Sequence, residues 1–421
     1  MFQFIHSADI HLDSPMYMLE RYEGAPVDEI RSATRRALEN LVELAISRHV
    51  DFVLLCGDLY DGDWRDYNTG LFFMSQMAKL HDAQIPVFLI AGNHDAANRM
   101  TRTLRLPDGI HLLKAGEPST ILLDHVGAAV HGQSFVSQAV HDDLSEKYPA
   151  AVKGFYNIGM LHTCASGRPG HDSYAPCTIR GLSLKNYDYW ALGHVHKREV
   201  LSETPLIVFP GNIQGRHIRE TGPKGCMLVT VDEKGDARPE FSPLDVVRWE
   251  KIEIDASGAD SESVLFERLM EETARIAGTT DLPLILRVIV SGRCPVHDEI
   301  SESMERLVNE IRSESMLSSG GRIWIEKVIL DTVPPVEDRL RNPTGPVSEL
   351  LAIIGEMSTD PQYLESIGGC LGDLWGKLPK EVRDSIEDAG PDDIEALKKL
   401  IGEVPSILLR RLRHPIGGTA I

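Results

Sequence analysis

The chain has 421 residues, of which 42% are hydrophobic and 25% charged, and its formal net charge at pH 7 is −20. This length predicts two or three domains, and the composition is that of a globular protein and excludes low-complexity and repeat architectures. The acidity argues against strong, autonomous, non-specific DNA binding, which neutralises phosphates with Lys and Arg, although bound metal ions or a partner subunit could supply positive charge.

Short apolar strands alternate with helices in the first part of the chain. The strands are expected at residues 2–8, 52–56 and 86–91, and the helices at 28–49 and 67–80. The longer helix is indicated by apolar residues that recur every three or four positions. This alternation predicts an α/β (α+β) domain in which helices pack on a sheet.

Strands dominate after about residue 123, where Gly, Pro and Asp turns separate them. They are expected at residues 128–131, 156–161, 187–191, 206–209 and 226–231. A mixed sandwich of sheets fits both halves of this region. The first domain is therefore expected to span residues 1–245.

A small second α/β domain is predicted over residues 246–331. Its strands and helices are expected to alternate, at residues 249–254, 261–276, 284–290, 298–315 and 323–330. The next segment, 332–346, contains four prolines and is interpreted as a linker. Short helices are expected in a third region, 347–421, which closes with the basic cluster Arg410, Arg411 and Arg413.

The chain carries no segment typical of secretion or membrane insertion. No apolar run approaches the roughly 20 residues that a membrane helix needs, and the N-terminus lacks the basic region and cleavage site of a signal peptide. The six cysteines contain no Cys-x-x-Cys pair, which argues against a disulfide framework and a zinc ribbon. They are Cys56, Cys164, Cys177, Cys226, Cys294 and Cys370. A cytoplasmic protein without membrane contact is expected.

Five polar blocks each follow a predicted strand. They are Asp-Ile-His at 9–11, Gly-Asp-Leu-Tyr-Asp at 57–61, Gly-Asn-His-Asp at 92–95, the single His162, and Gly-His-Val-His at 193–196. Open α/β sheets bind ligands at the carboxyl ends of their strands. Carboxylate, amide oxygen and imidazole suit manganese, iron, zinc or magnesium, and the histidines disfavour a pure magnesium or calcium cage. The blocks predict a divalent-metal site.

Each block also has a simpler interpretation when it is taken alone. Gly-Asp after a strand is often a turn with a capping aspartate, and a lone histidine such as His162 is more often a satisfied core residue. His-x-His is more suggestive, because a spacing of two puts both rings on one face of an extended segment. All five blocks in this order, each after a strand, make coincidence a poor explanation.

The same blocks resemble the calcineurin-like metallophosphoesterase superfamily, and within it the SbcD/YhaO-type branch of DNA-repair exonucleases. The opening run at 6–15 is similar to that branch, as is Pro-Gly-Asn-Ile-Gln-Gly-Arg-His at 210–217 followed by Gly-Pro-Lys-Gly-Cys at 222–226. The resemblance covers residues 1 to about 240 and is weak beyond. It implies a metallophosphoesterase β-sandwich flanked by helices, a small α/β cap domain and a helical C-terminal tail.

The resemblance also implies roles for individual residues. Seven metal ligands would form two sets: Asp9, His11 and His196 for one ion, Asn93, His162 and His194 for the other, and Asp58 between them. Manganese is the expected metal, with iron, zinc or magnesium as alternatives. His94 would be the general acid or would contact the scissile phosphate, and Asp95 would orient it.

One position departs from the pattern of some family nucleases. They carry a histidine where this chain has Asp61, whereas SbcD-like members often have Asp there, so the difference does not predict an inactive site. An acidic side chain would nevertheless repel a phosphate unless it is paired or points away.

The predicted function is a two-metal phosphodiesterase, expected to be an exonuclease or endonuclease subunit that acts on DNA, with linear ends as substrate. The implied partner is an SbcC-like or YhaN-like ABC-type ATPase, and a homodimer is also open. The apolar residues of the tail would either dock that ATPase or form a small helical subdomain. Two other functions stay open: a phosphodiesterase or phosphatase on a small nucleotide, and a non-catalytic scaffold of an ATPase complex.

Overall fold

The computed structural model describes residues 1–14, 30, 32–61, 67–97, 106–165, 174–334, 346–377, 393–395, 397–398, 400–402 and 404. These residues form two compact units. The first comprises 1–255, 263–290 and 303–331, and the second draws on 256–262, 291–302 and the described residues from 332 onward.

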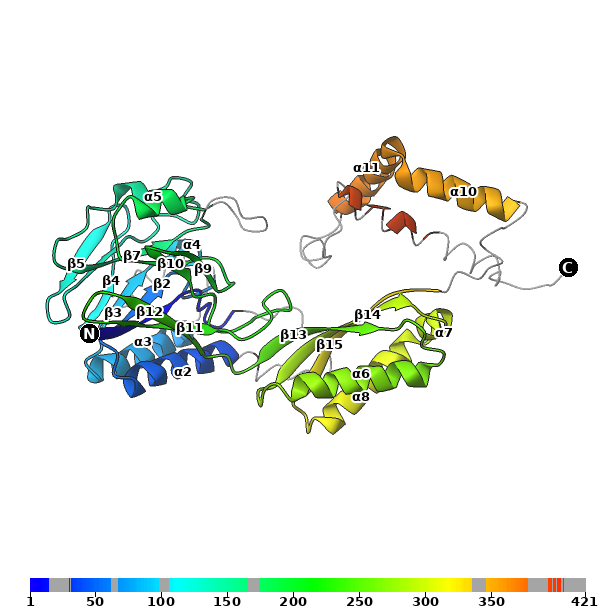
Figure 1. Ribbon diagram of the computed structural model, residues 1–421, viewed down its shortest axis with the longest axis horizontal. Helices are drawn as coiled ribbons and strands as arrows, with labels where there is room; N and C mark the ends of the chain where they lie inside the picture. Colours follow the sequence, from blue (N-terminus) through cyan, green and yellow to red (C-terminus); the bar gives the residue numbers. More distant parts are fainter. Residues whose placement is uncertain are drawn as a thin grey trace. The chain divides into compact units, whose positions relative to one another are not determined.

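Two six-stranded sheets form the main body of the first unit (Figure 1). The first sheet has the order β12 (Ala237–Pro243), β11 (Gly225–Val231), β1 (Phe2–Ser7), β2 (Phe52–Cys56), β3 (Val87–Ile90) and β4 (Ile110–Leu112). The second has the order β5 (Ser119–Leu123), β6 (Ala128–Gly132), β7 (Tyr156–His162), β8 (Tyr189–Gly193), β10 (Leu206–Phe209) and β9 (Glu199–Glu203). β1 to β4 run parallel, as do β6, β7, β8 and β10.

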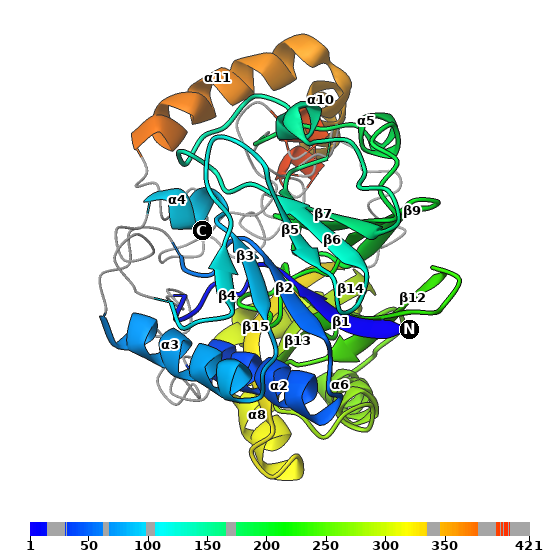
Figure 2. The same cartoon turned by 90° about the vertical axis from the view of Figure 1, so that its left-hand side faces the viewer.

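Strands β1 and β2 are buried on both faces, and their side chains alternate between two cores. Phe4 and Leu54 enter the core between the sheets, which β7 and β8 complete from the other side. Ile5 and Leu55 face a second core, formed with helices α2 (Ala33–Ser47) and α3 (Tyr67–Asp82), which cover that face of the first sheet (Figure 2). The alternation follows from the two-residue period of a strand. It produces the predicted sandwich flanked by helices.

Most predicted elements are found within a few residues of their expected bounds, and the strands at 52–56 and 206–209 match them. The helix expected at 28–49 is α2, which begins at Ala33; residues 28, 29 and 31 of that prediction lie outside the described residues. The short elements α4 (Asn93–Ala97), α5 (Ile179–Ser183) and η2 (Leu144–Lys147) were not predicted.

Beyond the sandwich, β13 (Arg248–Asp255), β14 (Leu284–Arg293) and β15 (Ile323–Val333) form a three-stranded sheet. Helix α6 (Glu262–Ala277) matches its prediction, but the single helix expected at 298–315 is wrong. It is divided into α7 (His297–Glu302) and α8 (Met304–Ser318), because the backbone of Ser303 leaves the helical region at φ −105° and ψ 18°. Ser303 is the N-cap residue of α8, since its backbone carbonyl accepts the N–H of Leu307 at 3.0 Å.

In the second unit, α10 (Pro346–Thr359) and α11 (Pro361–Lys377) share a small apolar cluster with the described residues near 400. Ile354 and Leu364 are buried in it, whereas Ile353 is 52% exposed. The apolar residues of the tail therefore form a helical subdomain and also leave apolar surface. None of the helices within the described residues is long and apolar enough to cross a membrane.

His6 joins the two sheets through a buried hydrogen-bond pair. Its Nε2 donates to the carbonyl of Leu192 at 3.0 Å, and its Nδ1 accepts from the hydroxyl of Tyr189 at 3.0 Å. Burial lowers the pKa of His6 from 6.5 to about 3, although the bond to Leu192 acts in the opposite direction. The ring is therefore neutral in the folded protein.

Acid is expected to weaken the sandwich through His6. The unfolded chain binds this proton near pH 6.5 and the folded chain only near 3, so stability is complete above pH 6.5 and falls as the pH drops toward 3. Between pH 7.5 and 5 the loss is about 2 kcal/mol at one histidine. Urea unfolding of the chelated protein at both pH values should show a loss that is about 2 kcal/mol smaller in His6→Gln than in wild type, because other buried groups such as His11 still titrate in the variant.

The control is His125→Gln, which replaces an exposed histidine of the same domain and should keep the wild-type pH dependence. If His6→Gln loses as much stability on acidification as wild type does, the neutral state assigned to His6 is wrong.

Candidate metal centre

The five predicted blocks come together where strands from both sheets end. β1, β2 and β3 supply the blocks at 9–11, 57–61 and 92–95, and β7 and β8 supply the other two. Two backbone bonds join the first blocks, from Asp9 N to Gly57 O at 3.1 Å and from His11 N to Asp58 O at 3.0 Å. The amide of His194 donates to the carboxylate of Asp9 at 3.0 Å and so ties the second sheet to the first. The site spans the open edge of the sandwich.

Four of the predicted ligands have a left-handed backbone. Their φ angles are 52° at Asp9, 45° at His11, 52° at Asp58 and 100° at His194. Residues other than glycine rarely adopt such angles, and backbone strain of this kind concentrates at functional sites. The loops are thus held in costly conformations that turn several polar side chains toward one place.

Two glycines allow the loops to approach one another closely. A Cβ at Gly92 would lie 2.3 Å from Oδ1 of Asp58, and one at Gly193 would lie 1.9 Å from the carbonyl oxygen of Cys56. Any side chain at either position would force the loops apart. These glycines are therefore part of how the site is assembled.

The first predicted ligand set is brought together. One donor atom from each of Asp9, His11 and His196 lies within 4.8 Å of the other two. Nε2 of His11 is 3.1 Å from Nε2 of His196, which is in turn 4.0 Å from Oδ1 of Asp9. Two imidazole nitrogens and a carboxylate around one point suit a borderline divalent cation.

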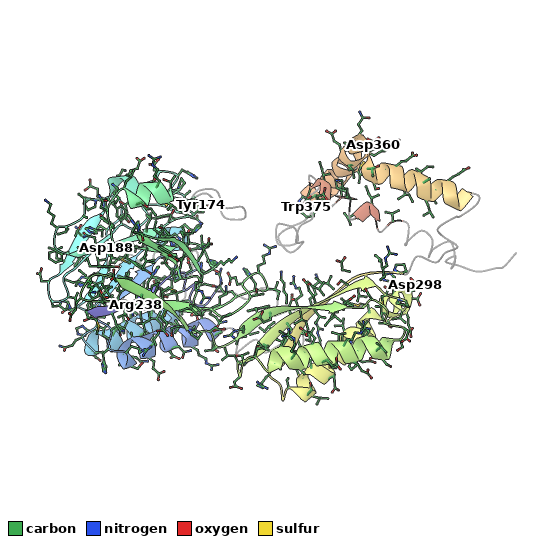
Figure 3. The ribbon with its side chains drawn as sticks, in the orientation of Figure 1. Tyr174, Asp188, Arg238, Asp298, Asp360 and Trp375 are labelled. Carbon is green, nitrogen blue, oxygen red and sulfur yellow. The ribbon has the colours of Figure 1, made fainter. Side chains whose placement is uncertain are left out.

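The second set converges in the same way. Donor atoms of Asp58, His162 and His194 lie within 4.8 Å of one another, and Asn93 Oδ1 is 3.0 Å from His162 Nε2. Nδ1 of His162 donates to the carbonyl of Cys56 at 2.9 Å, which leaves Nε2 to face the donors. The ring of Tyr174, labelled in Figure 3, lies 6.0 Å from that of His194.

Asp58 lies between the two sets. Its Oδ2 is 3.4 Å from Nε2 of His162 and 3.9 Å from Nε2 of His11, while its Oδ1 accepts the backbone N–H of His94 at 3.0 Å. Burial alone would raise the pKa of this carboxyl, but His162 and the neighbouring histidines hold it well below its usual range. Asp58 is therefore ionised and placed so that one oxygen faces both sets.

The other buried groups depend strongly on these charges. Burial raises the pKa of Asp9 to about 6, although His196 and His162 act in the opposite direction. Burial would lower the pKa of His162, but Asp58 raises it to about 9. Metal binding displaces protons from such ligands. A donor set of carboxylates, imidazoles and one amide, buried and crowded, fits divalent cations.

His94 is a partly exposed histidine beside the donor sets, with 33% of its side chain accessible. Its Nδ1 is 3.1 Å from Oδ1 of Asp61, and its ring lies edge-on to that of His11. Burial would lower the pKa of His94, but the hydrogen bond with Asp61 and the charge of Asp58 raise it. Asp61 therefore holds one side of this ring.

Asp95 does not orient His94, in contrast to the expectation. Its carboxylate accepts the backbone N–H groups of Leu59, Tyr60 and Gly92 at 2.9 to 3.1 Å. It therefore joins the second and third blocks rather than contacting the imidazole. The sequence pattern located an acid beside His94 in the chain, whereas the acid beside it in space is Asp61.

Asp61 is also paired, which lessens the repulsion that it would exert on a phosphate. Its Oδ2 accepts the hydroxyl of Ser14 at 2.6 Å and lies 3.8 Å from the guanidinium of Arg216. Burial would raise its pKa, but His11 and His94 keep it well below the usual range. Sequence reasoning assigned no role to Arg216, although it lies in the motif at 210–217.

Two parts of the sequence match known protein families. Residues 2–198 match the calcineurin-like phosphoesterases, and residues 249–333 match the middle domain of metallophosphoesterase YhaO. The uncharacterized metallophosphoesterase YhaO of Bacillus subtilis (strain 168) is 36% identical over 296 residues, which cover 69% of this chain and 72% of the relative.

Two archaeal relatives share the description "DNA double-strand break repair protein Mre11". That of Sulfolobus acidocaldarius is 24% identical over 379 residues, covering 87% of this chain and 91% of the relative. That of Saccharolobus solfataricus is 27% identical over 208 residues, covering 48% of this chain and 51% of the relative.

Proposed function

Because this chain belongs to the calcineurin-like metallophosphoesterase family, we propose that it is a two-metal phosphodiesterase and that its substrate is DNA. The observation that carries the phosphodiesterase proposal is the convergence of two donor sets on one shared carboxylate. In the proposal Asp9, His11 and His196 would hold one ion, Asn93, His162 and His194 would hold the other, and Asp58 would serve both. Two such ions, when bound, act as Lewis acids toward phosphoryl oxygens and activate water.

Three further residues, outside the two ligand sets, have proposed roles in the reaction. His94 is the proposed proton donor to the leaving oxygen, because its partly exposed ring lies beside His11 and the shared Asp58. Asp61 orients that ring and favours its protonated form. Arg216, whose guanidinium is 3.8 Å from Asp61, offsets the negative charge that Asp61 would otherwise present to a phosphate.

DNA as the substrate is supported by the relatives. The Sulfolobus acidocaldarius relative, described as a DNA repair protein, is similar over 87% of this chain, well beyond the residues that carry the site. In this proposal residues 1–245 contain the site, and residues 246–331 form a cap that helps to select DNA. Manganese is the proposed metal, because imidazole and carboxylate ligands suit it.

The net charge of −20 disfavours binding to DNA by this chain alone, which supports a partner subunit that helps to bind DNA. We propose an ABC-type ATPase that docks on the region 347–421, where Ile353 and Tyr363 are each 52% exposed. Amphipathic helices are a common docking element, because their apolar face fits a groove on the partner.

The test is manganese-dependent hydrolysis of end-labelled linear DNA, single- and double-stranded, beside bis-p-nitrophenyl phosphate and a mononucleotide ester. We expect cleavage of DNA and of the simple diester, and no DNA cleavage by His94→Ala. Hydrolysis confined to the small substrates, even with the ATPase added, would reject DNA and favour a small nucleotide. A chain that binds no manganese in a calorimetric titration would instead be a scaffold.

A further inference from the structure

The loop that follows β10 contains a buried carboxylate with no role so far. Glu220 is 4% exposed and lies at the end of the segment that begins with the motif at 210–217. Its Oε1 is 2.7 Å from Nδ1 of His196 and 3.0 Å from the guanidinium of Arg216. Its Oε2 accepts from Nδ2 of Asn212 and from the backbone N–H of Arg216, each at 2.8 Å. A third, longer bond to Oε2 comes from Nε of Arg216 at 3.4 Å, so both oxygens have several donors.

The loop that carries Glu220 is also hydrogen-bonded to the segment that leads into β13. Gln214 donates to the carbonyl of Val247 at 2.6 Å and accepts the N–H of Val246 at 2.9 Å. The indole of Trp249 donates to the carbonyl of Gly215 at 3.0 Å. Glu220 is thus presented by a rigid loop, and its own position does not depend on a bound ion.

This contact determines which nitrogen of His196 is available. The guanidinium of Arg216 also lies 3.2 Å from Nδ1 of His196, but it donates to Glu220 at 3.0 Å, and Glu220 is the nearer partner of Nδ1 at 2.7 Å. An ionised carboxylate can only accept, so Nδ1 of His196 carries a proton and Nε2 is left to face the donor set. That Nε2 is the atom 3.1 Å from His11 and 4.0 Å from Asp9. His162, in the other set, donates its Nδ1 to a neutral backbone carbonyl instead. The two sets therefore differ in the charge of the group behind a histidine.

We propose that Glu220 is a positioning residue that sets the tautomer and direction of His196 and strengthens the cation site of Asp9, His11 and His196 above what a neutral acceptor would give. The inference rests on the proposed function, because it treats His196 as a ligand. A carboxylate behind a ligating imidazole fixes the ring and raises its basicity, and loss of such a partner typically weakens metal affinity 10- to 100-fold. Arg216 offsets part of the charge of Glu220 inside the protein and shares its own charge with Asp61.

Manganese binding to wild type, Glu220→Gln and the control Glu203→Gln is the test. Glu203 is an exposed glutamate on β9, so its variant should behave as wild type. Glu220→Gln should weaken one of two calorimetric binding steps about 10- to 100-fold and leave the other within about threefold. In electron paramagnetic resonance, Glu220→Gln should also lack the signal of two spin-coupled manganese ions at manganese concentrations where wild type shows it. Two binding steps equal to those of wild type would overturn the inference and leave the proposed function intact.

A second measurement uses wild type and therefore does not depend on whether Glu220→Gln folds. Long-range proton–nitrogen spectra of metal-free wild type, labelled at histidine nitrogen and assigned with His196→Gln, report which nitrogen of His196 is protonated. We expect the proton on Nδ1; a proton on Nε2 would reject the role of Glu220. A wild type that binds no manganese but shows the Nδ1 tautomer would instead reject the proposed metal centre and retain the contact.

Discussion

Asp58→Asn is expected to lower kcat/KM for a phosphodiester on the order of 10³-fold or more, because it removes the charge that both donor sets share. One oxygen of Asp58 lies 3.4 Å from His162 and 3.9 Å from His11. An amide keeps the shape of the side chain and loses the negative charge, so a cation in either set loses an anionic ligand. We therefore expect both binding steps for manganese to weaken, in contrast to the one step expected for Glu220→Gln.

Rates with bis-p-nitrophenyl phosphate across a manganese titration measure this effect. Asp124→Asn, which changes an exposed aspartate of the same domain, is the matched control and should be silent. An Asp58→Asn protein that binds manganese and turns over as wild type does would remove Asp58 from the site.

His94→Gln is expected to have an effect that depends on the leaving group. A proton donor typically contributes 10²- to 10⁴-fold where the leaving oxygen is basic, as in DNA, and little where it is a nitrophenolate. We expect a loss in that range for DNA and below about tenfold for bis-p-nitrophenyl phosphate. Manganese binding should stay near that of wild type, because His94 belongs to neither proposed ligand set.

The ratio of the two losses decides between the roles left open for His94. Equal losses on both substrates would mean that His94 contacts the phosphate and does not deliver the proton. Asp61→Asn is a useful companion, because it leaves His94 in place and removes the negative charge of the acceptor 3.1 Å from its Nδ1. If Asp61 orients His94, this variant should show the same dependence on the leaving group, with a smaller loss.

The sequence was sufficient to predict the sandwich and the convergence of the five polar blocks, because both depend on local patterns. β2 is apolar at every position, as a strand buried on two faces must be, and it is followed at once by Gly57 and Asp58. A polar residue directly after a buried strand has to lie at the edge of the sheet. Every block obeyed that rule, so the predicted ligands met in space.

The supporting contacts could not be predicted, because they join side chains far apart in the chain. His94 and Asp61 are separated by 62–66, which lie outside the described residues, and by α3; only the fold brings the pair to 3.1 Å. Glu220 lies in a loop without hydrophobic periodicity, 24 residues after His196. Short elements such as α4, with five residues, are below the length at which periodicity can be detected.

The division of the donors between the two sheets has a mechanical consequence. Asp9, Asp58 and Asn93 follow strands of the first sheet, and His162 and His194 belong to the second. An ion held by donors from both layers would act as a cross-link between them, in addition to His6. Chelation would then remove a structural cross-link between the two sheets as well as the catalytic ions. Resistance to proteolysis at this edge of the sandwich would therefore measure metal occupancy without any substrate.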